Sequence, residues 1–216
     1  MSNNLLDAIG VKKAFLRTFI AFKRMNKWVV RLPNNRVDPN RVKSDAEQQT
    51  NTSFGDSRKF DSKFANAMRD CPAWAAAARH YGKDGQNGDN FQHHVNHDKL
   101  AGKVVACFHL FRFSMGTRSL PWNLDATRHG DTITITWHDP RHSGHASPHD
   151  TLLVGLLYSR HPGRPILIDH TGITRADGSF SFTINPRHAH HQNIHIYPFF
   201  ANPQRTEFSD SQHVSL

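Results

Sequence analysis

The sequence predicts an α+β protein with an antiparallel β-sandwich at its C-terminal end, and three observations support this prediction. Short segments of alternating apolar and polar residues, separated by turn residues, fill the last half of the chain. In the middle of the chain, phenylalanines at helical spacing follow a helix-start signal. The first 43 residues contain ten Lys or Arg residues and two acids, within a chain of net charge +9. We therefore divide the chain into a basic aromatic arm (1–43), a helical segment (44–102) and a β-sandwich (103–216).

The arm carries a net charge of +8 and has two structural interpretations. As a helix, residues 11–25 place most apolar side chains on one face and most Lys and Arg side chains on the other. As strands, AFLRTFIAFKR and KWVVRL flank the dipeptide MN in a hairpin rich in aromatic and β-branched residues. The periodicity favours a helix for residues 11–25, whereas the sequence WVV favours a strand after that dipeptide.

The charge of the arm indicates a docking role. A concentrated positive charge attracts polyanions, anionic membranes and acidic protein surfaces. The phenylalanines of the arm and Trp28 would form an apolar patch in water, which favours contact with a partner chain. The same residue types could instead hold phosphates and stack on nucleic-acid bases. The candidate partner-binding residues are Lys12, Lys13, Arg17, Lys23, Arg24, Trp28, Arg31, Arg36 and Arg41.

The middle segment predicts three helices. Ser44 and Glu47 have the spacing of a capping box, in which the Ser oxygen accepts from an early backbone N–H and the Glu reaches back. Phenylalanines then recur at spacings that suit one helical face. Pro72 suits the first turn of a second helix. Asp89 or Asn90 is the expected cap of a short third helix.

The last segment contains strand candidates separated by turn signals such as Arg-His-Gly, Asp-Pro and Ala-Asp-Gly. The candidates are KVVACFHLFRF, DTITITWHD, DTLLVGLLYS, RPILID, GSFSFTI, NIHIYPFFA and EFSDSQHV. Short antiparallel strands in this number and spacing are typical of an immunoglobulin or fibronectin type III sandwich. We expect Trp137 and Tyr197 in its core, because both lie among apolar residues in strand candidates. We also expect residues 103–216 to fold on their own, because patterning and turn chemistry agree there.

Four segments carry a resemblance to known proteins: RMNKWVVRLPN, SDAEQQ, FGDSRKF and HIYPFFANPQRTEFSDSQHV. Together they resemble a family of bacteroidete proteins of unknown function. Its members pair a basic N-terminal segment with a helical middle and a fibronectin-type-III-like C-terminal domain, and some are linked to mobile elements or phages. The resemblance implies a structural or interaction role in a virion or a surface assembly, and it supplies no catalytic residues.

The 17 histidines raise the question of a metal site. His93 and His97 are four residues apart on the expected third helix, a spacing that can place two imidazoles on one face. Other histidines gather in two expected loops, at 142–149 and 188–195. Neither a cysteine pair nor paired carboxylates supports these clusters, so we expect no metal and no cofactor. The two cysteines and the serines show no recognised nucleophile motif, and we expect no enzymatic activity.

These observations favour a non-enzymatic structural or interaction protein that docks through its arm, as a subunit of a phage-like virion or a surface assembly. One alternative is a nucleic-acid-binding accessory protein that uses the arm, and another is a His-dependent metal-binding protein. The expected partner is a protein, most simply other copies of the same chain. No stretch of about 18 apolar residues predicts a membrane span. No clear signal peptide is present, so we expect cytoplasmic synthesis with possible incorporation into an assembly.

Overall fold

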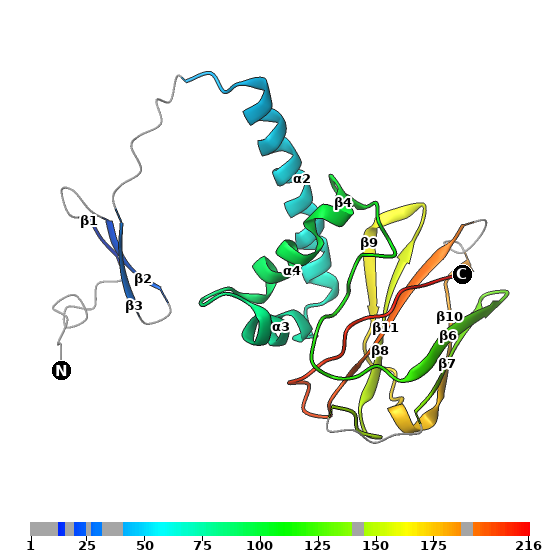
Figure 1. Cartoon of the computed structure of the whole chain (residues 1–216). Helices are drawn as coiled ribbons and strands as arrows, with labels where there is room; N and C mark the ends of the chain where they lie inside the picture. Colours follow the sequence, from blue (N-terminus) through cyan, green and yellow to red (C-terminus); the bar gives the residue numbers. More distant parts are fainter. Residues whose placement is uncertain (1–12, 16–19, 25–26, 32–40, 140–144, 187–191) are drawn as a thin grey trace, which may run out of the picture. The chain divides into compact units, whose positions relative to one another are not determined.

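A computed structural model of the protein describes all residues except 1–12, 16–19, 25–26, 32–40, 140–144 and 187–191. The chain forms two compact units, residues 1–48 and 49–216. The first contains a small sheet, and the second, which we call the body, contains helices and the remaining sheets (Figure 1). The structure thus mixes helices with antiparallel sheets, which confirms the α+β prediction.

Three short strands form the sheet of the first unit. They are β1 (Lys13–Phe15), β2 (Ile20–Arg24) and β3 (Lys27–Arg31), antiparallel in the order β1-β2-β3. Because β2 and β3 pair with Arg24 opposite Lys27, the predicted hairpin is confirmed. The helix favoured for residues 11–25 is wrong over the residues described. An isolated helix of about 15 residues is marginal in water, whereas three paired strands satisfy one another's backbone groups.

The helices follow the predicted order. They are α2 (Asp45–Ala67), α3 (Ala73–Tyr81), α4 (Gly88–Asn96) and the 3₁₀ helix η1 (His97–Lys99). The predicted capping box is present, because Glu47 N donates to Ser44 Oγ at 3.3 Å and Ser44 N donates to Glu47 Oε2 at 3.1 Å. The cap of α4 is Asn87, whose side chain accepts from Asn90 N, so neither residue proposed as its cap is correct. Within the described part of the chain, no helix is both long and apolar enough to span a bilayer.

Seven strands of the body form two antiparallel sheets. The three-stranded sheet has the order β10-β7-β6 and consists of β6 (Trp122–His129), β7 (Thr132–His138) and β10 (Ser179–Thr183). The four-stranded sheet has the order β12-β11-β8-β9 and consists of β8 (Thr151–Tyr158), β9 (His161–Ile168), β11 (Ile194–Ala201) and β12 (Val214–Ser215). A separate two-stranded sheet pairs β4 (Leu100–Ala101) with β5 (Val104–Val105). The loops also contain the 3₁₀ turn η2 (Arg175–Asp177).

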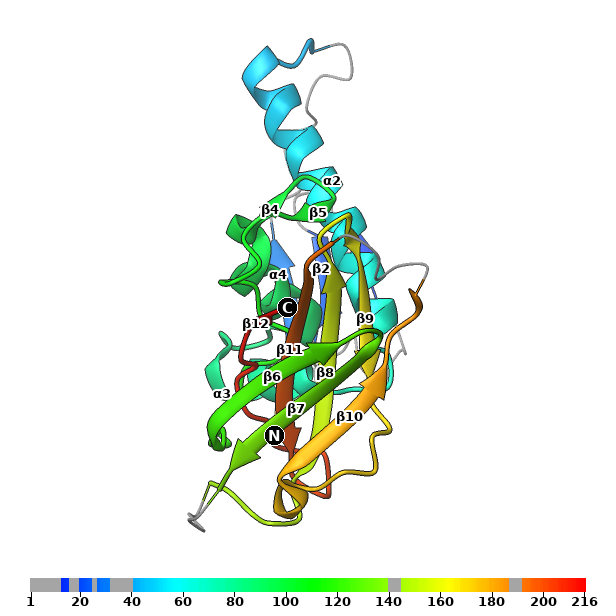
Figure 2. The same cartoon turned by 90° about the vertical axis from the view of Figure 1, so that its right-hand side faces the viewer.

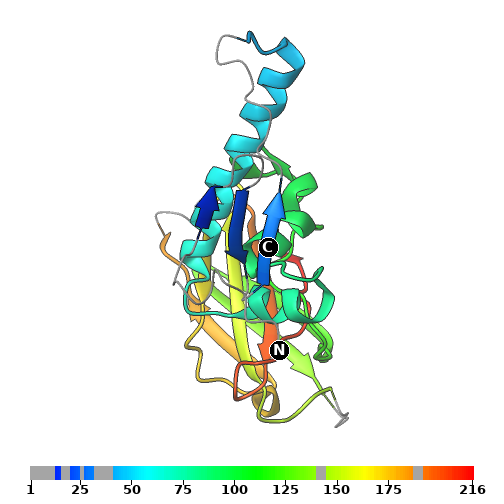
Figure 3. The same cartoon turned by 90° about the vertical axis from the view of Figure 1, so that its left-hand side faces the viewer.

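The four-stranded sheet is the middle layer of the body. On one face it packs against the three-stranded sheet, with Ile135 and Trp137 of β7 joining Leu152 of β8 in one apolar cluster (Figure 2). On the other face it packs against the helices, with Phe64 of α2 joining Tyr197 of β11 in a second cluster (Figure 3). Trp137 and Tyr197 are therefore both buried, as predicted, but Tyr197 belongs to the cluster that includes the helices.

The central strand β11 can contain a proline because its neighbour on one side, β12, is short and does not extend past this position. Pro198 lies opposite Val154 of β8, and its carbonyl accepts from Gln212 N at 3.1 Å, just before β12 begins. In an antiparallel pair the N–H and C=O of one residue point to the same neighbour. The missing N–H of Pro198 would thus point towards Gln212, not towards β8, so the ladder to β8 is intact.

Candidate functional site

The small N-terminal sheet gathers positive charge. Its strands, KAF, IAFKR and KWVVR, contain five basic residues and no acidic ones. The register places Arg24 opposite Lys27 and Lys23 opposite Trp28. Like charges directly opposite each other are unfavourable in a sheet. The register therefore puts two basic positions opposite each other at the end of the hairpin.

The structure brings five of the nine predicted docking residues into this sheet. They are Lys13, Lys23, Arg24, Trp28 and Arg31. Three more, Lys12, Arg17 and Arg36, lie outside the described residues. The ninth, Arg41, lies next to the start of α2, and its role is different.

Arg41 pairs with the capping residue of α2. Its Nη2 lies 2.7 Å from Glu47 Oε1. The pKa of Glu47 is lowered, first by the hydrogen bond from the backbone N–H of Ser44 and then by the charge of Arg41. Arg41 therefore helps to hold the first turn of the helix, and part of its charge is compensated within the chain.

The strands of the N-terminal sheet also carry apolar residues. Val30 of β3 is 59% exposed, whereas Ala21 of β2 is buried. Trp28 is half-buried, and its buried indole N–H has no hydrogen-bond partner among the described residues. The combination of cations, an exposed valine and an aromatic ring is the composition expected of a mixed apolar and electrostatic contact surface.

His93 of α4 and His97 of η1 are engaged within the fold. The rings of His93 and His97 lie 5.5 Å apart, so the predicted shared face is real. His93 Nδ1, however, lies 2.8 Å from Asp61 Oδ2 of α2, and His97 Nδ1 lies 3.0 Å from a backbone carbonyl oxygen. Among the residues that the structure describes, no three His, Cys, Asp or Glu side chains form a group able to hold a metal ion. His142, His188, His190 and His191 fall outside those residues.

Sequence reasoning missed a pair of neighbouring histidines, the buried His195 of β11 and the half-buried His213 just before β12. His195 Nδ1 lies 3.0 Å from His213 Nε2, and His195 Nε2 lies 3.0 Å from Ser159 Oγ. Phe108 stacks on the His195 ring at 3.8 Å. Burial, followed by the neighbouring His213, lowers the pKa of His195 from 6.5 to about 4. This imidazole is therefore neutral near pH 7, and it serves as a hydrogen-bonding element of the core.

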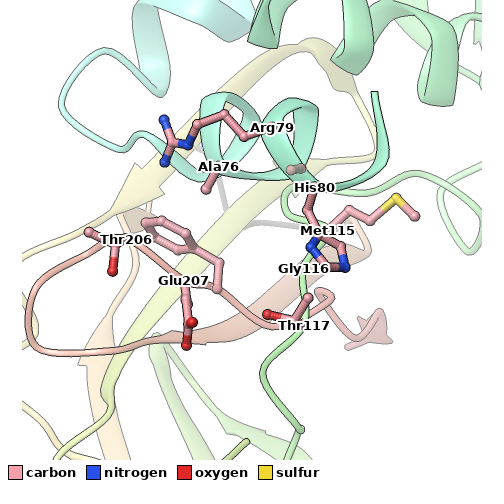
Figure 4. A pocket seen from close by; sticks show the side chains of 10 residues that line it. Ala76, Arg79, His80, Met115, Gly116, Thr117, Thr206 and Glu207 are labelled. Carbon is pink, nitrogen blue, oxygen red and sulfur yellow. The ribbon is translucent and has the colours of Figure 1, made fainter. Parts of the chain in front are cut away.

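A cavity of ≈ 220 Å³ opens beside α3, lined on the opposite side by residues 115–117 and 206–208 (Figure 4). Its polar lining combines Arg79, His80 and Glu207. Figure 4 shows the Arg79 side chain extending away from Glu207, whose Oε2 lies 3.3 Å from Arg118 Nη1. The polar groups do not converge on one point, so this cavity does not by itself define a binding chemistry.

Comparison of the chain with models of known protein families, with curated proteins and with solved structures finds no match.

Proposed function

We propose that this protein is a non-enzymatic interaction protein that docks through its N-terminal sheet, β1–β3. The observation that carries the proposal is the concentration of basic residues in a small folded unit. Residues 1–48 contain ten basic and four acidic residues. The much longer body contains seventeen basic and fourteen acidic residues. A sheet with this charge, attached to a nearly balanced body, favours a docking element over a solvated face.

The proposed partner is a protein, and copies of the same chain are the simplest choice. The body contains fourteen acidic residues, among them the exposed Asp70, Asp84 and Asp89, with which the basic residues of the sheet of another copy could pair. Val30 of the N-terminal sheet is exposed, as are Phe54, Leu110 and Trp122 of the body, each more than half. The resemblance to the bacteroidete family supports an assembly of such copies, in a virion or at a surface.

We further propose that the two packed sheets form a fibronectin-type-III-like sandwich. The first, second and fifth of their strands (β6, β7 and β10) form one sheet, and the third, fourth, sixth and seventh (β8, β9, β11 and β12) form the other. This distribution, with all pairs antiparallel, supports the proposal. In such an assembly the sandwich would present its loops while the N-terminal sheet makes the docking contact.

The docking proposal predicts that charge reversal in the sheet abolishes assembly. In the variant Arg24→Glu/Arg31→Glu, the new Glu at position 24 lies opposite Lys27, so the sheet gains a favourable cross-strand pair. We expect the wild type to sediment as an oligomer and this variant as a monomer with an unchanged melting temperature. The control Lys63→Glu/Arg164→Glu makes the same change in charge at exposed positions of the body and should still assemble. A monomeric wild type, or an assembling sheet variant, would contradict the proposal.

Nucleic acid is the second candidate partner, because Lys23 lies opposite Trp28 in the register and a cation beside an aromatic ring suits a phosphate and a base. A mobility shift of single-stranded DNA that weakens steeply with salt would favour this function. The Arg24→Glu/Arg31→Glu variant should then lose the shift, and the body control should keep it.

A further inference from the structure

The two packed sheets of the body have four edge strands, β6, β9, β10 and β12, and three of them are protected against pairing with another chain. β6 has a register shift after Trp122 and contains the charged residues Asp125 and Arg128. β9 contains two prolines and an arginine, and β12 is only two residues long. Bulges, charges, prolines and short length are the usual means by which proteins protect a sheet edge.

The fourth edge strand, β10, has none of these features. It pairs with β7 on one side and is the last strand of its sheet on the other (Figure 2). Its five residues, SFSFT, include no charge and no proline, and its register with β7 runs without a shift. A regular, uncharged edge of this kind is a ready template for one more strand.

Two hydrogen bonds just beyond the ends of β10 show which of its backbone groups face β7. Trp137 N donates to Gly178 O at 3.0 Å, and Ile184 N donates to Asp131 O at 2.9 Å. In an antiparallel pair, hydrogen-bonded and non-hydrogen-bonded positions alternate. Every second residue from 178 to 184 therefore points its backbone N–H and C=O towards β7.

The remaining backbone groups of β10 point away from the sheet. Phe180 and Phe182 fall at the positions bonded to β7, so the outward N–H and C=O groups are those of Ser179, Ser181 and Thr183. Within the described part of the chain, no backbone hydrogen bond or isolated bridge reaches these three residues from outside the sheet. Three donors and three acceptors are thus presented in a row along the free edge.

The side chains of β10 divide between two faces. The serines and the threonine are exposed, and Ser181 Oγ lies 2.8 Å from Thr134 Oγ of β7. Phe180 and Phe182 are half-buried and pack against the core between the two sheets, with their ring centroids 5.5 Å apart. An added strand that also carried aromatic residues on this inner face would cover the exposed part of both rings.

The sequence of β10 itself provides such a strand, because its pattern reads the same in both directions. When two copies lie antiparallel with Ser181 opposite Ser181, Phe180 of each copy faces Phe182 of the other, and Ser179 faces Thr183. The outward backbone groups then meet as hydrogen-bonded pairs, each of which exchanges two bonds. Aromatic pairs and Ser–Thr pairs across strands are stabilising. A twofold dimer needs a surface that is complementary to itself in this way.

We propose that β10 is a contact between two copies of this protein, which joins their three-stranded sheets edge to edge into one continuous sheet. No residue of the N-terminal sheet takes part, so each copy has a second binding surface in addition to the docking element. Five residues per copy bury much less than the roughly 1,200–2,000 Å² of a stable interface. The contact is therefore weak by itself and is strengthened where docking already holds copies close together.

The test is oxidative crosslinking of the full-length Ser181→Cys variant, which traps even a weak dimer. Cys107→Ser removes the half-buried native thiol, and the other cysteine, Cys71, is buried. Opposite residues of a hydrogen-bonded antiparallel pair have Cα atoms about 5.5 Å apart, which suits a disulfide. Non-reducing electrophoresis should show a dimer. The matched control Thr127→Cys should stay monomeric, because this exposed position lies in the same row of the sheet, on the other side of Thr134.

A mixture of two single-cysteine variants tests the register of the pairing. Ser179→Cys and Thr183→Cys should crosslink to each other more than either does to itself, because the proposed pairing places these positions opposite each other. Adding Ser181→Pro to both variants should abolish this dimer. Since the N–H of residue 181 points outwards, proline there removes no hydrogen bond to β7, and the melting temperature should stay nearly unchanged.

The Ser181→Cys dimer should also form when Arg24→Glu/Arg31→Glu is present, so a failure of docking and a failure of this pairing are distinguishable. Equal crosslinking of Ser181→Cys and Thr127→Cys would overturn the proposal, as would a dimer that persists with Ser181→Pro. No crosslink at position 181 would also overturn it, and it would leave the edge of β10 to an extended segment of a different protein.

Discussion

His195 shows how a single residue can be titratable and yet belong to the core. Phe108 stacks on the ring, and both ring nitrogens have a partner, one in Ser159 and the other in His213. The pKa of His213 is lowered as well, first by burial and then by His109. Protonating either ring therefore places a cation in a poorly hydrated site beside another imidazole.

This histidine pair predicts a loss of stability on acidification. The pKa of His195 is about 4 in the folded protein and near 6.5 in the unfolded chain, so between these values only the unfolded state binds the proton. The stabilisation is complete above pH 6.5 and is lost as the pH falls towards 4. Urea unfolding at pH about 7.5 and about 5 should show the decrease. In His195→Gln, which does not titrate, the decrease should be smaller.

The matched control for this experiment is His80→Gln, at an exposed position of α3. It should show the same pH dependence as the wild type. If His195→Gln loses as much stability on acidification as His80→Gln does, then the histidine pair is not the source of the effect.

At the scale of the elements, β8 packs closely against Phe113. Gly155 lies at its centre, and a Cβ added there would lie 2.3 Å from Cγ of Phe113. Phe113 is fully buried between the strand and the helices, so it cannot move aside easily. Glycine in a central strand normally weakens it, but here the missing side chain makes room for the aromatic ring.

Gly155→Ala should therefore destabilise the protein by about 1–3 kcal/mol through overpacking. A smaller side chain at position 113 should relieve this overpacking. The double variant Gly155→Ala/Phe113→Leu should therefore lose less stability than the sum of the losses in the two single variants. Gly55→Ala is the control, because nothing lies within 4 Å of the added Cβ in the middle of α2. It should stabilise the helix by up to about 1 kcal/mol. Additive losses in the double variant would contradict the close contact.

The elements differ in how well the sequence predicts them, for physical reasons. Apolar and polar residues alternate strictly along β7, so the sequence predicts this strand. β6 buries only Leu124 and Ala126, and the sequence does not predict it. A strand is also predicted where almost none exists. Of the strand expected over residues 103–113, only the two residues of β5 form a strand. Its alternating Phe111 and Phe113 are buried against the helices from an irregular segment. Burial therefore produced the alternation there without any strand pairing.

The candidate sites show the same limit. The basic hairpin can be read from neighbouring residues, because charge and β-propensity are local properties. The contact of His195 with Ser159 and His213 depends on how β8, β11 and β12 pair, which no local pattern reveals.

On the scale of the whole molecule, the four-stranded sheet is a middle layer, with the helices packed on one face and the three-stranded sheet on the other. Leu153, Leu157 and Phe199 of that layer are buried in the cluster that includes α2, α3 and α4. This arrangement changes the expectation that residues 103–216 fold on their own. Without the helices, one face of the four-stranded sheet would be an exposed apolar surface.

We therefore expect the fragment 44–216, which keeps the capping box of α2, to melt cooperatively at nearly the temperature of the full chain. The fragment 103–216 should bind a hydrophobic dye and melt without a sharp transition. Circular dichroism and dye fluorescence of the two fragments test this. Cooperative melting of 103–216 without dye binding would show that the sandwich is independent of the helices.

The double-sided burial of β8 and β11 has a further consequence for amide hydrogen exchange. Every backbone N–H of these strands that joins the ladder lies beneath a second layer on both sides, so no local fluctuation of a single layer exposes it to water. Their deuterium uptake should require opening of the entire body, whereas the edge strands β9 and β10 can exchange through partial opening. The slowest amides of this protein would then report its global free energy of unfolding directly.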